Sequence, residues 1–257
     1  MPNRPWTREE FILTLNLYFK IPFGKMNKST EEVIQLAQLI GRTPSAIAMA
    51  LGNFASVDPY HKGRNVMGLS HRNAKVETIW NEFVQNRDDL MFESELILAQ
   101  RQNTTVEKKY SNVLEDIKPL TGSDKLRMIK VRVNQALFRQ IVLVNYNYKC
   151  AVSGIDLIDI LVASHIIPWS ANISERLNPE NGICLSPLYD KAFDRGLITF
   201  SDDYKLVLSK RLKSNESKDY YSKYFHPIEG IKMSTPSKYY PSKAFLEYHQ
   251  ENVFLKS

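Results

Sequence analysis

One histidine and two aspartates lie close together in the second half of the chain. His165 belongs to an apolar, strand-like run, and Asp190 and Asp194 follow in a segment with helical character. Residues four apart share one face of a helix, and two like charges there are unfavourable unless a cation or a basic side chain lies between them. Histidine exchanges protons near neutral pH. These residue types therefore suit proton transfer beside a bound cation. The alternatives are a histidine satisfied within the core and an Asp194 that pairs with Arg195 or caps a turn.

The segments around these residues predict the order strand, strand, helix. Apolar and β-branched runs over 149–154 and 160–167 flank a turn, and the second run carries His165. Pro187 favours the start of a short helix, since its missing N–H costs nothing in the first turn. Residues 197–209 predict a further hairpin, and the apolar spacing over 131–146 predicts a helix before the first strand.

The first hundred residues have helical character. Thr7 and Glu10 have the spacing of a capping box, the N-terminal signature of a helix. Two short amphipathic helices follow at 31–40 and 45–54, joined by a turn that contains Gly41. That layout is typical of a helix-turn-helix motif, whose second helix enters the DNA major groove. An ordinary helical hairpin fits the same spacing.

Three regions are expected along the chain. Residues 1–100 form a helical domain and residues 125–257 a second domain. Residues 101–124 form a linker, because "RQNTTVEKKY" and "KPLTGSD" are polar and lack periodicity.

Composition excludes several classes of protein. The chain has 257 residues, 43% of them hydrophobic, and no apolar run long enough to span a membrane. Its N-terminus lacks the apolar core of a signal peptide, so we expect a cytoplasmic protein that does not bind membranes. Two isolated cysteines, Cys150 and Cys184, support neither a disulfide framework nor a structural zinc site. The net charge of +6 and two lysine- and arginine-rich segments, 123–135 and 204–218, suit a polyanionic partner or a solvated face.

Three short motifs occur together in the second half of the chain: "ASHIIPWS" with His165, "NPENGICL" with Asn181, and "SPLYDKAFDRGL" with Asp190. In this order they resemble the HNH endonucleases, and within them the subgroup common among restriction-associated nucleases. The resemblance covers roughly residues 130 to 255. It implies an α+β protein in which a ββα-metal domain follows the all-α helix-turn-helix-like domain.

The resemblance also implies roles for individual residues. His165 would be the general base and Asn181 the second catalytic residue, holding the loop that orients His165. Asp190, Asp194 and Ser164 would be the metal ligands, and hard oxygen ligands favour Mg²⁺ or Mn²⁺. The sequence departs from the commonest pattern twice, since Ser164 replaces the usual Asp or His and Asp190 replaces His or Asn.

Cations and polar residues on both domains are candidate contacts to double-stranded DNA. In the second domain these are Lys191 and Arg195, which fit surface cations nearly as well. In the first domain, polar side chains of the proposed recognition helix would read bases, and cations beside it would hold phosphates. That set comprises Ser45, Asn53, Arg42, Lys62, Arg64 and Arg72, and Asn53 also fits a helix C-cap.

These inferences lead to a metal-dependent DNA endonuclease, a phosphodiester hydrolase of the restriction or defence type in which a modified base is one candidate requirement. A homodimer would let it cut both strands. The first alternative is a nicking or mobile-element endonuclease. The second is a non-catalytic DNA-binding protein with a degenerate nuclease fold, and Ser164 is its best support.

Overall fold

The protein has an α+β fold made of two compact units. The computed structural model describes residues 4–62, 74–117 and 121–256. Unit 1 comprises Met1–Ile141 and unit 2 Val142–Ser257, so the division falls inside a helix. The segment expected to be a linker, 101–124, holds short helical turns, and Lys109 and Tyr110 in it bond to Glu95 of the preceding helix. The linker and the domain bounds 1–100 and 125–257 stay predictions.

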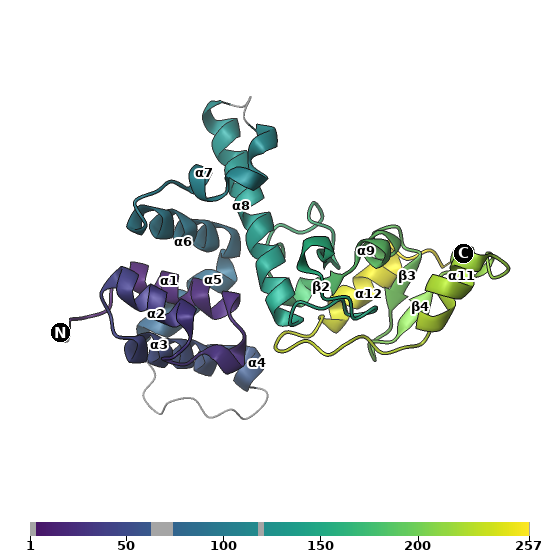
Figure 1. Ribbon diagram of the computed structural model, residues 1–257, viewed down its shortest axis with the longest axis horizontal. Helices are drawn as coiled ribbons and strands as arrows, with labels where there is room; N and C mark the ends of the chain where they lie inside the picture. Colours follow the sequence, from purple (N-terminus) through teal and green to yellow (C-terminus); the bar gives the residue numbers. More distant parts are fainter. Residues whose placement is uncertain (1–3, 63–73, 118–120, 257) are drawn as a thin grey trace. The chain divides into compact units, whose positions relative to one another are not determined.

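Unit 1 is built from helices, which Figure 1 shows gathered into a bundle. The Thr7–Glu10 capping box forms as predicted and starts α1. Gly41, with φ +66°, ends α2 in the left-handed conformation that glycine adopts at little cost, and Thr43 then caps α3. The helices are α1 Arg8–Lys20, α2 Glu31–Ile40, α3 Pro44–Val57, α4 Pro59–Lys62, α5 Ala74–Gln85, α6 Arg87–Arg101, α7 Val106–Lys109 and most of α8 Gly122–Asn145, with 3₁₀ turns at Phe23–Lys25, Ser111–Val113 and Glu115–Ile117.

An aromatic cluster forms the core of unit 1. Phe19 lies against both Trp80 and Phe83, with ring centroids 6.0 and 4.7 Å away. Tyr18 contacts Phe54 in α3, and it is fully buried. Burial of such large rings dominates the energetics of a small core. The helices predicted at 31–40 and 45–54 are confirmed as α2 and α3, although α3 continues to Val57.

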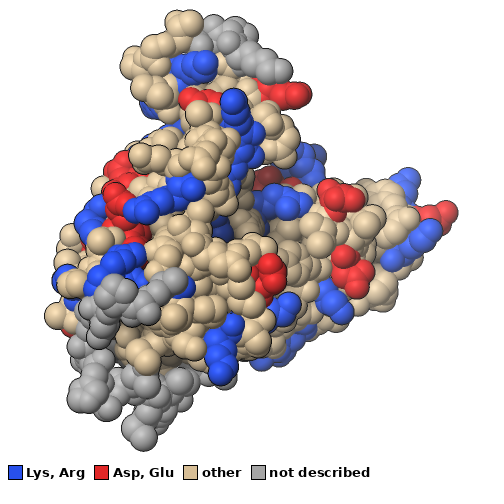
Figure 2. Space-filling view, turned by 60° about the vertical axis from the view of Figure 1, so that its left-hand side comes forward, with Lys and Arg blue, Asp and Glu red and all other residues tan. Residues whose placement is uncertain are grey.

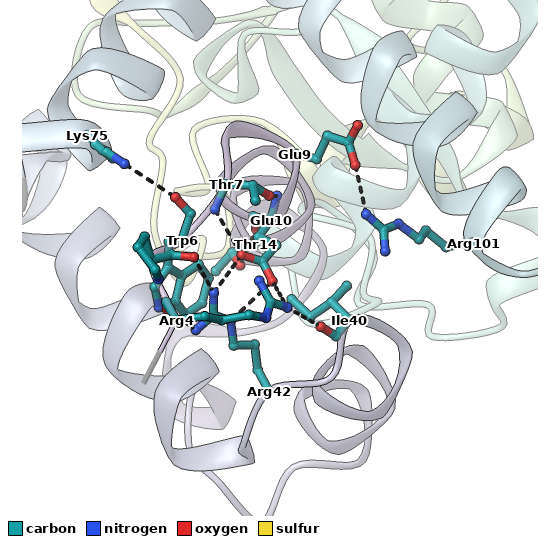
Figure 3. A network of polar contacts seen from close by, with 11 residues as sticks. Arg4, Trp6, Thr7, Glu9, Glu10, Thr14, Ile40, Arg42, Lys75 and Arg101 are labelled. Atoms are coloured by element: carbon teal, nitrogen blue, oxygen red, sulfur yellow. Dashed lines mark hydrogen bonds and ion pairs between the residues drawn. The ribbon is translucent and has the colours of Figure 1, made fainter. Parts of the chain in front are cut away.

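Two buried glutamates in unit 1 are surrounded by cations from the same unit. Glu10 accepts bonds from Arg4 and Arg42, the network drawn in Figure 3. Burial alone would raise the pKa of Glu10, but the bonds from Arg42, Arg4 and the Thr7 N–H outweigh it and lower the pKa to about 2.

Glu95 is enclosed in a second network of this kind. It is fully buried and pairs with Lys20 and with Lys109, the latter at 2.7 Å. Tyr110 Oη donates a further bond at 2.8 Å. Burial again acts to raise the pKa of Glu95, and the two lysines lower it to about 2.

Unit 2 contains two small antiparallel sheets and the helices that cover them. Strand β1 Val162–His165 pairs with β2 Gly182–Leu185, with His165 opposite Gly182 and Ser164 opposite Ile183. Strand β3 Ile198–Phe200 pairs with β4 Leu206–Leu208, which confirms the predicted hairpin. The helices are α9 Pro187–Asp194, α10 Lys210–Lys213, α11 Asp219–Tyr224 and α12 Lys243–Asn252, with 3₁₀ turns at Ile158–Ile160, Pro179–Asn181 and His226–Ile228.

The strand predicted over 149–154 is wrong. Those residues form a turn, closed by the bonds Cys150 N–H to Ile155 O and Gly154 N–H to Cys150 O. Gly154 has φ +72°, which a strand does not allow. The partner of β1 comes from residues 182–185 instead. The helix predicted over 131–146 is the second part of α8, which begins at Gly122.

The core of unit 2 lies where α9 and α12 pack beside β3, as Figure 1 shows. Phe193 and Phe200 are fully buried there, with ring centroids 5.9 Å apart. Among the helices of the described ranges, none has both the length and the apolar character required to cross a membrane.

Candidate active site

A cavity of about 520 Å³ opens between β1, α9 and α12 of unit 2. It brings together six of the residues proposed from the sequence. They are Ser164 and His165 from β1, and Asp190, Lys191, Asp194 and Arg195 from α9 and its C-terminal end. Trp169 and His249 line the same cavity. The residues reach it because β1 ends at His165 and Pro187 starts α9 directly after β2.

The His165 imidazole is held in one tautomer. Its Nε2 lies 3.0 Å from the carbonyl oxygen of Arg176. A carbonyl oxygen only accepts, so Nε2 carries the proton and Nδ1 is the nitrogen that can take up another. Burial lowers the pKa of His165 to about 4, so the ring is neutral at cellular pH. A neutral, oriented imidazole is the state that a general base requires.

Two residues that sequence analysis did not identify orient His165. Arg176 supplies the carbonyl for His165, and its side chain donates to Trp169 O at 2.7 Å. The guanidinium also lies over the Trp169 ring, 5.0 Å from its centroid, and that ring meets the His165 ring edge to face. Trp169 is part of the motif "ASHIIPWS", whereas nothing in the spacing of Arg176 indicated its role.

Asn181 is buried and fixes the loop between β1 and β2. Its Oδ1 accepts from Ile167 N–H at 2.8 Å, and its Nδ2 donates to the carbonyls of Ile167 and Glu175. The side chain thus ties together the residues that follow His165 and those that precede Arg176. This geometry suits a residue that orients His165 through the loop. Asn181 does not line the cavity.

Asp190 and Asp194 line the cavity, with Lys191 and Arg195 beside them in sequence. In the described part of the chain neither carboxylate forms an ion pair. Burial raises the pKa of both groups, and at Asp194 the charge of Asp190 adds to the rise, while Lys191 opposes it at both. Ser164 Oγ is buried and faces Asp190, whose pKa it helps to lower. That hydroxyl has no described partner with hydrogen-bond geometry.

The donor set fits a hard divalent cation. Two carboxylates one helical turn apart and the buried Ser164 hydroxyl beside Asp190 offer oxygen atoms, which Mg²⁺ and Mn²⁺ prefer. Within the described ranges no group of three or more His, Cys, Asp or Glu side chains is arranged as a metal site. Mg²⁺ is nevertheless commonly held by one or two carboxylates together with water and substrate phosphate.

A family model decides which kind of domain this is. Residues 150–201, which span β1, β2, α9 and β3, match the HNH endonuclease family. Unit 2 contains an HNH endonuclease domain. Among curated proteins, no match to the chain was found.

Lys191 and Arg195 of the HNH domain are exposed beside the two aspartates. Their position at the cavity suits contacts to phosphate. On the face drawn in Figure 2, the described Lys and Arg side chains are interspersed with Asp and Glu and form no continuous basic stripe. The two cysteines of the domain are buried, and Cys150 Sγ accepts bonds from Ser153 N–H and Ser186 N–H.

The residues proposed for DNA binding in unit 1 differ in their exposure and in their hydrogen bonds. Ser45 is exposed at the start of α3 and Asn53 is partly exposed near its end. Arg42 is enclosed in the structural network of Figure 3, since its guanidinium donates to Glu10 and to the carbonyls of Arg4 and Pro5. A phosphate contact by Arg42 stays a prediction, and it would compete with these hydrogen bonds. Arg64, Arg72 and the side chain of Lys62 lie outside the described residues.

Proposed function

We propose that the protein is a divalent-metal-dependent endonuclease that hydrolyses phosphodiester bonds in duplex DNA. One observation carries the proposal. His165, in its base-competent tautomer, shares a cavity with two aspartates that form no ion pair with any described residue, within a domain of the HNH endonuclease family. Hydrolysis of a phosphodiester requires a base for the attacking water and positive charge against the phosphate, and the cavity offers residues for both.

Six residues of the cavity, together with Asn181 of the loop behind His165, have assigned parts in this proposal. His165 Nδ1 accepts the proton of the attacking water, while the Arg176 carbonyl keeps Nε2 protonated. Asp190 and Asp194, with Ser164 Oγ beside Asp190, would hold Mg²⁺ or Mn²⁺, and such an ion would supply positive charge against the phosphate oxygens. Lys191 and Arg195 bind the flanking phosphates. Asn181 keeps the loop behind His165 in place.

The helices of unit 1 are proposed to bind the duplex, with α3 entering the major groove. The exposed side chain of Ser45 and the partly exposed Asn53 suit contacts to base edges, and the segment with Arg64 and Arg72 would contact phosphates. A DNA-binding unit joined to a nuclease suits restriction of foreign DNA, with or without a modified base. The homodimer expected for double-strand cutting stays a prediction.

Plasmid cleavage tests this function. Supercoiled DNA from methylating and non-methylating hosts is incubated with the protein in Mg²⁺, Mn²⁺ or EDTA. We expect metal-dependent conversion to nicked or linear forms, and a loss of roughly two to four orders of magnitude in rate for His165→Ala. His226→Ala is the matched control, because His226 is an exposed histidine of the same unit that does not line the cavity. Equal rates for the two variants would remove His165 from the mechanism.

A second candidate function is DNA binding without cleavage. It is favoured by the lack, among the described residues, of three or more His, Cys, Asp or Glu side chains placed to hold a metal. Duplex affinity that persists in EDTA, together with no cleavage of any plasmid in either metal, would support it over the endonuclease.

A further inference from the structure

His249 in α12 joins three elements around the candidate site. Its Nε2 lies 3.1 Å from the carbonyl oxygen of Phe193 in α9, and its Nδ1 lies 2.9 Å from Thr199 Oγ1 in β3. The carbonyl accepts, so Nε2 carries the proton and Nδ1 accepts the threonine hydroxyl. The ring stacks on Phe193 with centroids 3.7 Å apart and planes 5° from parallel. His249, Phe193 and Thr199 are all buried.

The carbonyl that His249 binds belongs to the last turn of α9. This turn closes with bonds from Gly196 N–H to Phe193 O and from Leu197 N–H to Ala192 O, the arrangement that ends many helices at a glycine. Gly196 has φ +65°, and a Cβ there would collide with the carbonyl oxygen of Val253.

The chain after α12 also binds this turn. Leu255 N–H donates to Gly196 O at 2.9 Å, and Val253 lines the cavity. The end of α9 is therefore fixed from outside by the segment 249–255. Asp194 is the residue between the Phe193 carbonyl and this fixed turn.

We propose that His249 is a positioning residue of the endonuclease site, which holds the Asp194 carboxylate in the orientation that binds the metal. The inference rests on the proposed function. His249 acts through backbone, since its hydrogen bond fixes the peptide unit that joins Phe193 to Asp194. Removal of a group that hydrogen-bonds to and orients a metal ligand commonly lowers metal affinity or activity by about 10- to 100-fold.

The surroundings of His249 suit a residue that orients its neighbours and not one that transfers protons. Both ring nitrogens are engaged in described hydrogen bonds, and burial lowers the pKa of His249 to about 4. The imidazole ring is therefore neutral and keeps its single tautomer throughout the pH range in which the enzyme would work. Its task is orientation, whereas His165 carries the proton.

Three substitutions separate positioning from packing. His249→Gln places an amide nitrogen near Nε2 and keeps the bond to Phe193 O, while His249→Asn keeps only the Thr199 side. His249→Phe keeps an aromatic ring on Phe193 and loses both bonds. We expect kcat to fall about 10- to 100-fold in the Phe and Asn variants, with KM for DNA nearly unchanged, and the Gln variant to recover most of the loss. Mn²⁺ affinity, measured from the paramagnetic resonance of the free ion, should follow the same order.

Leu246→Ala is the control for stability, because Leu246 is a fully buried residue of α12 with no polar role. Rates are measured below the melting temperature of every variant. Should the Phe variant not fold, the Asn and Gln variants decide, since both lose the ring and differ in which bond they keep. Equal kcat and Mn²⁺ affinity in Asn and Gln would overturn the inference.

A wild-type protein that binds Mn²⁺ but cleaves no DNA would overturn the proposed endonuclease function without overturning the role of His249. The Mn²⁺ affinities of the variants then decide on His249 alone. A wild type that binds no Mn²⁺ overturns both.

Discussion

Unit 1 contains a pair of buried glutamates and the HNH domain a pair of aspartates that line its cavity, and the two pairs differ in what neutralises their charge. Glu10 and Glu95 of unit 1 are bound by arginines and lysines of the same unit, and their pKa values fall to about 2. Asp190 and Asp194 of the HNH domain have raised pKa values and form no ion pair in the described part of the chain. The charges of the two glutamates are thus neutralised by residues of the same unit, and those of the two aspartates are not neutralised by any described ion pair.

The difference separates structural charge from functional charge. A buried carboxylate paired by its own chain contributes to folding, and removal of one partner leaves the other charge uncompensated. A carboxylate pair held one turn apart without a cation costs stability, and a bound ligand can offset that cost. Such perturbed groups in a cavity are therefore candidates for function. If the comparison is right, matched substitutions at the two pairs have opposite consequences for stability and activity.

The largest effect is expected for Asp190→Asn. Cleavage should fall by about two to four orders of magnitude, because stabilisation of phosphate charge by a metal is worth several kcal/mol. The free energy of unfolding should stay the same or rise by about 0.5 kcal/mol, since the repulsion with Asp194 is removed. Plasmid cleavage and urea unfolding measure the two quantities on one preparation. A stability loss of the size seen for a buried ion pair would break the comparison.

Glu95→Gln should have the opposite profile. The variant leaves Lys20 and Lys109 without their shared carboxylate, and we expect a loss of about 3–5 kcal/mol in the free energy of unfolding. Glu93→Gln is the matched control, because Glu93 pairs with Arg8 at the surface, where such pairs are worth about 0–1 kcal/mol. In a Trp169→Phe background the remaining tryptophans, Trp6 and Trp80, both report on unit 1. Similar losses in the two variants would show that Glu95 is not a structural charge.

Acid should destabilise unit 1 through Glu10. The folded pKa of about 2 lies below the usual glutamate pKa of 4.5, so the stabilising contribution is fully present above about pH 4.5 and is lost as the pH falls towards 2. The lost stability amounts to about 3 kcal/mol. Urea unfolding of the Trp169→Phe protein at several pH values, followed by the same two tryptophans, should show this slope. Glu10→Gln should flatten it, and an unchanged slope would contradict the assignment.

Local signals in the sequence predicted much of what surrounds the site. Pro187 gives the start of α9, the capping box of Thr7 starts α1, and the β3–β4 hairpin follows from a short turn between apolar runs. His165 lies at the end of β1 as expected. These features depend on interactions between residues close together in the chain, so they can be predicted without knowledge of the fold.

Features that depend on distant residues were not predictable. The partner of β1 is β2, beyond a long loop, and not the adjacent run 149–154 that has similar composition. Arg42 has the charge of a phosphate contact, but its donors are used by Glu10 and by two carbonyls of the N-terminal segment. The Arg176 carbonyl that fixes His165 is a backbone atom, which any residue type could supply. Residue type does not reveal which partner a group meets.

The smallest effect concerns metal binding in the absence of DNA. A cation that binds the folded HNH domain stabilises it by RT ln(1 + [L]/Kd), about 1.4 kcal/mol at ten times Kd. Mg²⁺ or Mn²⁺ should therefore raise the melting temperature of the wild type by a few degrees, and Asp190→Asn should lose the rise because the carboxylate pair no longer exists. Asp203→Asn is the matched control, since it removes one carboxylate from an exposed pair with Lys205 and should keep the rise. Differential scanning fluorimetry over a metal titration measures all three proteins. An equal rise in all three would mean that the ion binds elsewhere, and the contrast between the two carboxylate pairs would then have no functional meaning.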